Sequence, residues 1–320
     1  MRVSWTRGGL IRGSFVPNEK FQELRALQRT RKQLTREQTR HVQRLQKTLE
    51  ESNIKLDSVI SDIMGLSGRR MIEAIIAGVR TPRKLADLAD RRIKATPKEL
   101  YDALHGRVTD HHRFRLRLHL AQYDALAEAI AALAKEIDTA IGRIDEERES
   151  AGQAPFRAAS REVSEIPGIN LSAANMILAE IGLDMQRFPT EAHIVAWGGL
   201  CPGHNESAGK RKSSKLRKGA PWLKMTLVQC AVSASNKKDS YFRAQFQRLK
   251  SRRGAPKAYC AVAASLLTTI YHMLKHATKF RDLGHEHFDK HPTKAKVNRL
   301  LAQLARLGYH ADVRPLANAA

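Results

Sequence analysis

The residues best suited to chemistry lie in one short basic stretch, residues 198–224. Ser207 is expected there in a glycine-rich loop, where free backbone amides can bind an anion. Six basic residues follow it closely: Lys210, Arg211, Lys212, Lys215, Arg217 and Lys218. A serine that attacks a phosphodiester needs such a setting, because cations must neutralise the charge that builds up on the phosphorus oxygens. The residue types leave three positions open: Ser207 as nucleophile or loop serine, and Glu206 and His204 as bases or solvated side chains.

Basic residues greatly outnumber acidic residues in and after this stretch. Between Ser207 and Arg281 the chain has 18 Lys or Arg and a single carboxylate, Asp239. The whole sequence of 320 residues carries a formal net charge of +24. Such a domain repels itself unless a polyanion compensates, so we expect nucleic acid, DNA above all, as the partner. A ribosomal protein or a membrane-surface protein would share this composition.

Other sequence features bear on compartment and metal binding. No apolar run approaches the roughly 20 residues that a spanning helix needs, and no signal peptide opens the sequence. Three cysteines lie far apart without CxxC or Cys/His ligand spacing: Cys201, Cys230 and Cys260. This spacing argues against a disulfide framework and against a zinc site. We therefore expect a cytoplasmic, nucleoid-associated protein with no membrane partner and no metal site of its own.

A second candidate contact with nucleic acid is the stretch VSEIPGINLSAA, residues 163–174. An apolar residue, Pro-Gly, another apolar residue and an alanine-rich helix form the helix-hairpin-helix pattern. The amides around Gly168 and Asn170 could then hold a phosphate at the start of the second helix. A plain helical turn explains the same pattern, because Asn170 stands where a second glycine is usual.

Two long helices are expected to carry the first half of the chain. Asn18 can cap a helix that runs to about residue 53. A second helix should begin near residue 109, with apolar residues spaced alternately three and four apart: Tyr123, Leu126, Ile130, Leu133, Ile137, Ala140 and Ile144. This seam favours a coiled coil or a long helical hairpin, and an ordinary bundle helix remains equally open. Shorter helices are expected at 56–64, 69–78, 82–89 and 97–105.

The remaining elements complete a mainly α fold. We expect helices at 222–234, 241–250, 258–276 and 293–307, of which 258–276 would be the core helix. Short strands are expected at 10–17 and 308–313. The resulting division is a terminal piece 1–17, a helical or coiled-coil region 18–150, a helical C-terminal domain 155–285, and a tail helix with a short strand 286–320.

Three motifs then point to a family: AWGGLCP at 196–202, ESAGK at 206–210 and RKGAPWLK at 217–224. Together they resemble the transposases of the IS110/IS1111 family, whose C-terminal domain is of the IS116/IS110/IS902 type. The resemblance extends to IPGINLSAANMILAEIG, GLIRGSFVP, RKQLTREQTRHVQRLQKTLEESNIKL and LARLGYHADVRPL. It covers nearly the whole chain from Leu10.

The resemblance implies a particular reaction. Such transposases combine an N-terminal RuvC-like nuclease fold, whose four acidic residues hold Mg²⁺, with a coiled-coil region and a C-terminal domain. The C-terminal domain supplies a serine that becomes covalently attached to DNA, and Ser207 is the matching position. A structured guide RNA, which pairs with donor and target DNA, would account for part of the positive charge. We expect a homo-oligomer.

One departure from the family limits this expectation. The acidic quartet lies upstream of the segment that matches GLIRGSFVP, and this sequence has no Asp or Glu before Glu19. Most of the RuvC-like fold and its Mg²⁺ site would then be missing, and the acids of the helical region match no family motif. We therefore expect an N-terminally truncated copy that binds nucleic acid, binds no specific Mg²⁺ and is catalytically incomplete. The alternative is a non-catalytic DNA- or RNA-binding regulator of a full-length transposase.

Overall fold

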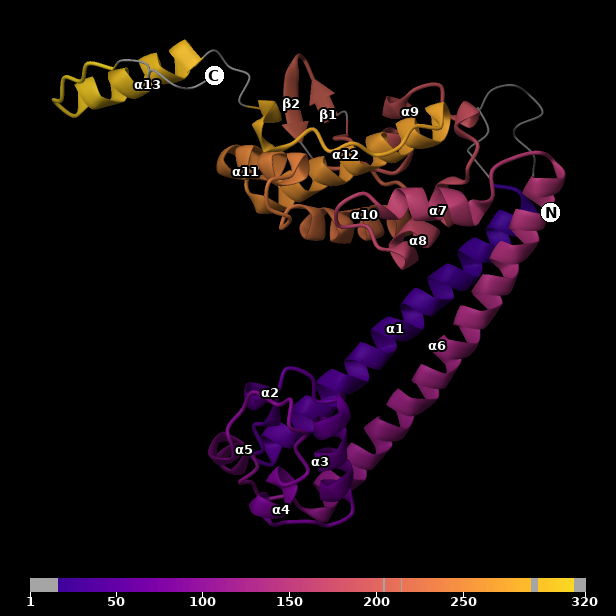
Figure 1. Ribbon diagram of the computed structural model, residues 1–320, viewed down its shortest axis with the longest axis vertical. Helices are drawn as coiled ribbons and strands as arrows, with labels where there is room; N and C mark the ends of the chain where they lie inside the picture. The colour runs from indigo at the N-terminus through magenta and orange to yellow at the C-terminus, as the bar shows by residue number, and fades with distance from the viewer. Residues whose placement is uncertain (1–16, 204, 214, 289–292, 314–320) are drawn as a thin grey trace. The chain divides into compact units, whose positions relative to one another are not determined.

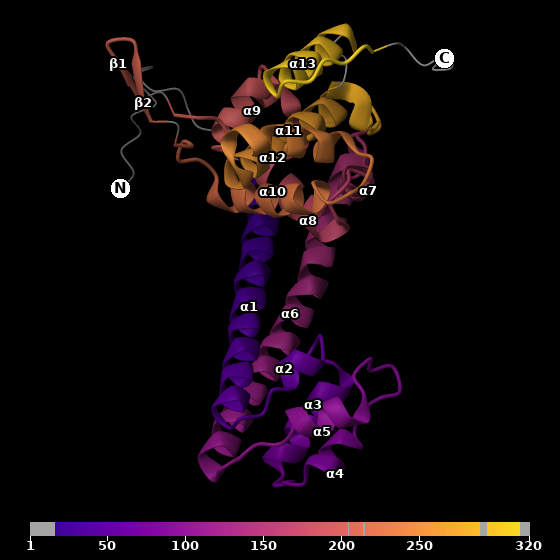
Figure 2. The same ribbon diagram turned by 90° about the vertical axis from the view of Figure 1, so that its left-hand side faces the viewer.

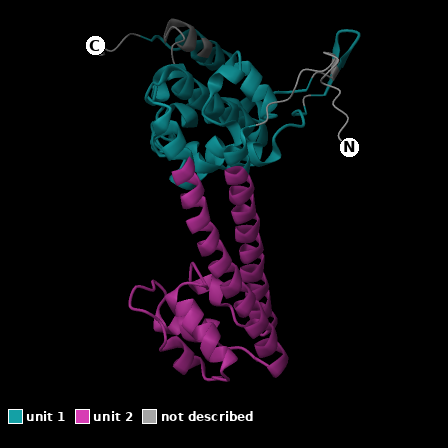
Figure 3. Ribbon diagram, turned by 90° about the vertical axis from the view of Figure 1, so that its right-hand side faces the viewer, with its two compact units in different colours: residues 1–22, 144–320 teal, residues 23–143 magenta. Residues whose placement is uncertain are grey.

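The computed structural model describes residues 17–203, 205–213, 215–288 and 293–313. It is 68% helical and has almost no strands, which confirms the mainly α fold (Figure 1). The strand expected at 10–17 lies outside the described residues except for Pro17. Two compact units are distinguished: residues 23–143 form one, and residues 1–22 with 144–320 form the other (Figure 3).

Two long helices run through the unit 23–143, and each extends beyond it. Helix α1 spans Glu19–Glu51 and helix α6 spans Asp110–Ser150, close to the expected bounds. The side-chain oxygen of Asn18 accepts a hydrogen bond from the amide of Phe21 at 3.1 Å, as an N-cap does. On the expected seam of α6, Ile137, Ala140 and Ile144 are buried. The coiled coil itself stays a prediction.

Four short helices lie between α1 and α6 in the chain: α2 (Leu56–Val59), α3 (Leu66–Ile76), α4 (Pro82–Ala86) and α5 (Pro97–Ala103). Helix α2 is shorter than expected because Ile60 takes an extended backbone, with φ −123° and ψ 140°. Helix α5 begins with a capping box between Thr96 and Glu99. These helices close a core around Leu45, Leu49, Ile72, Leu100 and Leu116, all at most 3% exposed.

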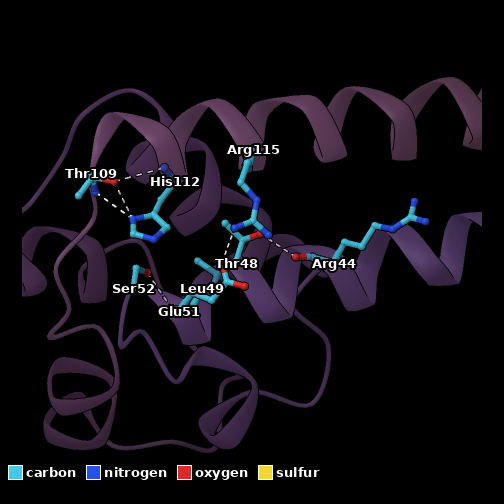
Figure 4. A network of polar contacts seen from close by, with 8 residues as sticks. All are labelled: Arg44, Thr48, Leu49, Glu51, Ser52, Thr109, His112 and Arg115. Carbon is cyan, nitrogen blue, oxygen red and sulfur yellow. Dashed lines mark hydrogen bonds and ion pairs between the residues drawn. The ribbon is translucent and has the colours of Figure 1, made fainter.

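A small polar network joins the end of α1 to the start of α6 (Figure 4). The guanidinium of Arg115 pairs with the carboxylate of Glu51. This hydrogen bond is the main reason why the pKa of Glu51 lies below its ordinary value. The Thr109 amide donates to Nδ1 of His112 at 3.2 Å, which closes the first turn of α6. The amide of Arg107 donates to the carbonyl of Ser52 at 2.7 Å, so the backbone also ties the two helix ends together.

The second unit is built around helix α12, Ala255–His276. It packs on α9 (Glu191–Trp197), α10 (Pro221–Ala234) and α11 (Tyr241–Arg253). Eight of its residues are buried, which confirms it as the core helix. The Tyr271 hydroxyl donates to the carbonyl of Phe188, at 3.0 Å, just after the short 3-10 helix η2 (Met185–Arg187). Helices α7 (Phe156–Ser164) and α8 (Leu171–Ile181) precede these elements.

The last described elements are η3 (His285–Phe288) and helix α13, Thr293–Arg306. Residues 308–313 do not form the short strand that the sequence predicts. Gly308, at φ 84°, instead ends α13 with a Schellman motif. In this motif the Tyr309 amide donates to the Leu304 carbonyl at 3.0 Å, and the Gly308 amide donates to that of Ala305 at 3.1 Å. Apolar and polar residues alternate after Gly308, as they do in a strand, but no described segment pairs with them.

None of the helices in the described ranges combines the length and the apolar character that a bilayer crossing requires.

Candidate nucleic-acid interface

Ser207 lies on a β-hairpin, where the sequence predicted a loop. Strand β1 (Asn205–Ser207) pairs antiparallel with β2 (Lys210–Ser213), the one sheet among the described residues. The connection is Ala208-Gly209, with φ 51° and 72°; two positive φ values in a two-residue connection are typical of a type I′ turn. The loop prediction was wrong because Ala-Gly lacks the Asn-Gly or Asp-Gly signature by which such a turn is usually found.

Irregular segments join the hairpin to α9 and α10. We call residues 199–219, the hairpin together with these segments, the ribbon. Pro202 and Leu216 form an isolated bridge. On either side of it, the Gly203 amide donates to the Lys215 carbonyl at 2.8 Å, and the Arg217 amide donates to that of Cys201 at 3.2 Å. Figure 2 shows this ribbon standing away from α10, α11 and α12.

The base of the ribbon is fixed in the core of the unit. Leu200 is 4% exposed. A Cβ on Gly198 would lie 3.2 Å from the Leu267 side chain of α12 and 3.5 Å from Leu223 of α10. The Ala220 amide donates to the carbonyl of Trp197 at 3.3 Å, immediately before α10 begins. The ribbon therefore extends from a rigid helical base while its tip is in solvent.

The cations expected to bind nucleic acid are gathered on this ribbon. Five of their side chains are exposed: Lys210, Lys212, Lys215, Arg217 and Lys218. Arg211 lies on β2, with its backbone opposite Glu206 in the register. None of the five exposed cations forms an ion pair with a carboxylate in the described ranges. The ribbon is therefore a dense and uncompensated patch of positive charge, the kind of surface that phosphates neutralise.

Ser207 itself is exposed at the end of β1 and is paired with Lys210 in the register. Residues directly opposite one another share a face of a hairpin, so Lys210 lies on the same face as the serine. Glu206 precedes Ser207 on the strand, and successive side chains point to opposite faces. Glu206 is therefore poorly placed to act as the base for Ser207, whose hydroxyl has no hydrogen-bond partner in the part of the chain described. His204 lies outside the described residues.

In the described ranges, no group of three or more His, Cys, Asp or Glu side chains is placed so that it could hold a metal ion. The expectation about Mg²⁺ stays a prediction, because this ion is often held by one or two carboxylates together with phosphates. The aspartates of the short-helix region serve local structure instead. Asp62 accepts from the amide of Met64 at 2.9 Å, and Asp90 accepts from that of Arg92 at 3.1 Å.

The stretch in which the sequence predicts a helix-hairpin-helix folds as α7, a turn at residues 165–170 and α8, and its assignment to that motif stays a prediction. Asn170 is the N-cap of α8, and its side-chain oxygen accepts from the Ala173 amide at 2.8 Å. Gly168, at φ 84°, packs against the last turn of α10, since a Cβ there would lie 2.4 Å from the amide nitrogen of Ala234. Packing alone therefore explains the glycine, and a role for Gly168 and Asn170 in binding phosphate stays a prediction.

The structure does not bring the two predicted contact elements together. The ribbon leads into α10 at Pro221, and the turn of Gly168 meets α10 at Ala234. A helix of 14 residues rises by about 20 Å, so the two elements lie at opposite ends of α10. Any shared ligand must extend over that length, as a nucleic-acid strand does.

A further cavity, which the sequence did not indicate, lies between α11 and α12. Tyr241, Phe242 and Phe280 contribute aromatic side chains to it, beside Lys279 and Arg281. Burial raises the pKa of the Tyr241 hydroxyl above its ordinary value. The only signal in the sequence is a row of polar residues on one face of the otherwise apolar α12.

Residues 160–247 match the family described as Transposase IS116/IS110/IS902 family. The matched region contains Gly168, Asn170, the hairpin and all six basic residues that follow Ser207. It is therefore a transposase-type domain of the IS110 family. A search of curated proteins gave no match to the chain.

Proposed function

We propose that the chain acts on DNA as an insertion-sequence transposase and binds it through the ribbon that carries Ser207. The observation that carries this proposal is the exposed set of cations on the ribbon, which lack carboxylate partners within the described ranges. Phosphates stabilise positive charge of this density, and the cations that binding releases from the nucleic acid supply much of the binding free energy. The match of residues 160–247 to a transposase family supports DNA as the ligand.

Within that function, Ser207 is the nucleophile for strand cleavage. Its Oγ would form a bond to a DNA phosphorus while the bond from that phosphorus to one deoxyribose oxygen breaks. The serine proton passes to a base, and the leaving oxygen takes up a proton. Lys210, directly opposite on the hairpin, offsets the negative charge that builds up on the phosphoryl oxygens.

The described residues lack the groups that would activate this serine. A hydroxyl at its free pKa is a weak nucleophile, and no described side chain accepts its proton. We therefore propose that Ser207 and the basic ribbon bind nucleic acid but do not cleave it by themselves, and that acidic residues of a RuvC-like domain are needed for the reaction. The second candidate function is a non-catalytic binder that regulates a complete transposase. The observation that favours it is again the Ser207 hydroxyl, which has no hydrogen-bond partner among the described residues. A structured RNA is a further partner that fits the basic surface, and a second copy of the chain is proposed as a partner on the family resemblance alone.

A salt series tests the binding proposal. Alanine substitution of Lys210 and Lys212 should weaken binding to duplex DNA. The slope of log K against log salt should become shallower by about 0.9 for each phosphate that the protein no longer neutralises. The matched control replaces Lys237 and Lys238, which are also exposed and lie outside the ribbon. Equal slopes for the two double variants would exclude the ribbon from the interface.

A cleavage assay tests the role of Ser207. A fusion that places an acidic RuvC-like domain ahead of Leu10 should form a covalent protein–DNA adduct in Mg²⁺, and Ser207→Ala should abolish it. Ser233→Ala, which removes an exposed serine of α10, should leave the adduct unchanged. Adduct formation by the chain without the fusion would refute the need for added acids. Adduct formation by the Ser207→Ala fusion would refute the nucleophile.

A further inference from the structure

Helix α12 carries a polar stripe that its role as the core helix does not explain. Ser265, Thr268, Thr269 and His272 recur at positions i, i+3, i+4 and i+7, so they share one face of the helix. That face lines a cavity of about 390 Å³. The other walls come from the start of α11 and from residues 278–283. A stripe of hydroxyls on an apolar helix indicates a polar ligand at this face.

The hydroxyls of the stripe have unused hydrogen-bonding capacity of both kinds. Ser265 Oγ accepts from Gln245 Nε2 at 2.8 Å, which leaves its own hydrogen to donate. Thr269 Oγ1 donates to the Ser265 carbonyl at 3.0 Å, which leaves its lone pairs to accept. Thr268 makes no side-chain hydrogen bond to any described residue. Close by, Gln245 Oε1 is buried without a partner in the described structure, and a buried acceptor of this kind calls for a donor.

Aromatic rings form one wall of the cavity. The rings of Phe242 and Phe280 stack with their planes 12° apart and their centroids 6.3 Å apart. Phe242 is 2% exposed and fixes Phe280, which is half-buried at the cavity. A planar heteroaromatic ring can stack on such a wall whatever its identity, because every base has a π-face.

Two cations stand at the mouth of the cavity. Lys279 and Arg281 are exposed, and neither forms an ion pair with a residue in the described ranges. The nearby carboxylate of Asp282 is already used, since its Oδ1 accepts from the amides of Tyr241 at 2.9 Å and Gly284 at 3.0 Å. These bonds hold residues 278–284 against the start of α11. The two cations outnumber this one carboxylate, and hydrogen bonds from backbone amides to the Asp282 side chain hold the segment in place.

We propose that this cavity binds one unpaired nucleotide of a nucleic-acid strand. The base stacks on Phe280 and exchanges hydrogen bonds with Ser265, Thr268 and Thr269, while its phosphate lies between Lys279 and Arg281. The volume falls in the range of small-ligand sites, roughly 300–1,000 Å³. The two cations more than neutralise the single negative charge of one phosphodiester group, and the neighbouring phosphates can continue onto the basic surface of the domain. This inference rests on the proposed function, because it assumes that the chain binds nucleic acid.

The test uses the full chain with single-stranded and duplex oligonucleotides, and the single strands carry 2-aminopurine. Insertion of the fluorescent base into the cavity should change its emission on binding. Thr268→Val keeps the side-chain shape and should weaken single-strand binding about fivefold, the effect of removing one hydrogen bond, without changing duplex binding. Joint replacement of Lys279 and Arg281 by alanine should weaken single-strand binding more than joint replacement of Lys237 and Lys238 does.

DNA and RNA single strands form separate arms of this test. Weaker binding by Thr268→Val in either arm supports the cavity and identifies the strand that it takes. Unchanged single-strand affinity in both arms overturns the proposal, as does 2-aminopurine emission that does not respond to wild-type protein. If a variant fails to fold, the response of 2-aminopurine emission to wild-type protein still tests the proposal. Absence of all nucleic-acid binding by the wild-type chain would instead contradict the proposed function, so the two failures are distinguishable.

Discussion

The backbones of Gly219 and Gly199 are in direct contact at the base of the ribbon, since a Cβ on Gly219 would lie 2.5 Å from the amide nitrogen of Gly199. Gly199 has φ 70°, in the region that favours glycine. The two strands of the ribbon can approach this closely only because neither residue has a side chain. The junction between the helical core and the exposed cations therefore depends on this pair.

We predict that Gly219→Ala opens this junction. The added methyl must push the two strands apart, so the amides of Gly203 and Arg217, which bond across the ribbon, should exchange with solvent faster. Binding to DNA should weaken as the ribbon loses its fixed base. The control is Gly142→Ala, inside α6, where a Cβ meets nothing within 4 Å. That change should stabilise the protein by roughly 0.5–1 kcal/mol. Unaltered exchange at both amides in Gly219→Ala would contradict the prediction.

A second prediction concerns the seam of α6. Ile137 is 5% exposed, so Ile137→Asp buries a carboxylate without a partner and should cost more than about 3 kcal/mol of unfolding free energy. Lys135 is exposed two residues earlier on the same helix. Lys135→Asp introduces the same residue and should change stability by no more than about 0.5 kcal/mol. Chemical denaturation of the two variants measures the difference; equal midpoints would show that the seam contributes no burial.

A third prediction concerns pH. The rings of His41 on α1 and His119 on α6 meet edge to face, with centroids 5.4 Å apart, and both Nδ1 atoms are buried without a partner among the described residues. Burial lowers the pKa of both histidines below its ordinary value. Arg44 lowers the pKa of His41 further, against an opposing effect of Glu37, and His41, Arg44 and Arg115 lower that of His119.

The sign of the effect follows from these shifts. Unfolded histidines take up protons near pH 6.5, whereas the folded pair resists protonation until a lower pH. Stability should therefore be constant above about pH 7 and fall as the pH drops below about 6.5. His119→Leu should flatten this dependence, while His111→Leu, at an exposed position of α6, should preserve it. Melting temperatures at several pH values measure it, and an identical slope in wild type and His119→Leu would rule out the pair as its source.

Helix positions follow from the sequence because their signals are local. Asn18 caps α1, Thr96 and Pro97 begin α5, and the apolar spacing of α12 gives its buried face. The lengths of α2 and α4 do not follow: Ile60 takes an extended backbone directly after α2, and α4 ends at Ala86, before the end at residue 89 that the sequence predicts. Likewise, Gly168 is indistinguishable in sequence from a phosphate-binding glycine, and only its contact with α10 reveals a packing role.

The basic composition of the candidate interface was predictable from the sequence, whereas its folding into a hairpin was not. Six basic residues after Ser207 are evident from the sequence, whereas the pairing of Ser207 with Lys210 depends on a turn formed by Ala208 and Gly209. The cavity between α11 and α12 was not predictable, because Phe242 and Phe280 lie 38 positions apart and meet only in the fold. Residues that share a site through tertiary packing leave no spacing in the sequence.

Ala208 holds a left-handed backbone at the tip of the hairpin, where an alanine costs on the order of 1 kcal/mol. The paired part of the tip is short, and isolated two-stranded hairpins are at best marginally stable. A cost of that size is therefore a large share of what keeps the tip closed. Hairpins form in about 1–10 μs, so a tip that has opened can close again within microseconds. The time that Ser207 spends beside Lys210 then becomes a quantity that the ligand can lengthen by occupying the ribbon.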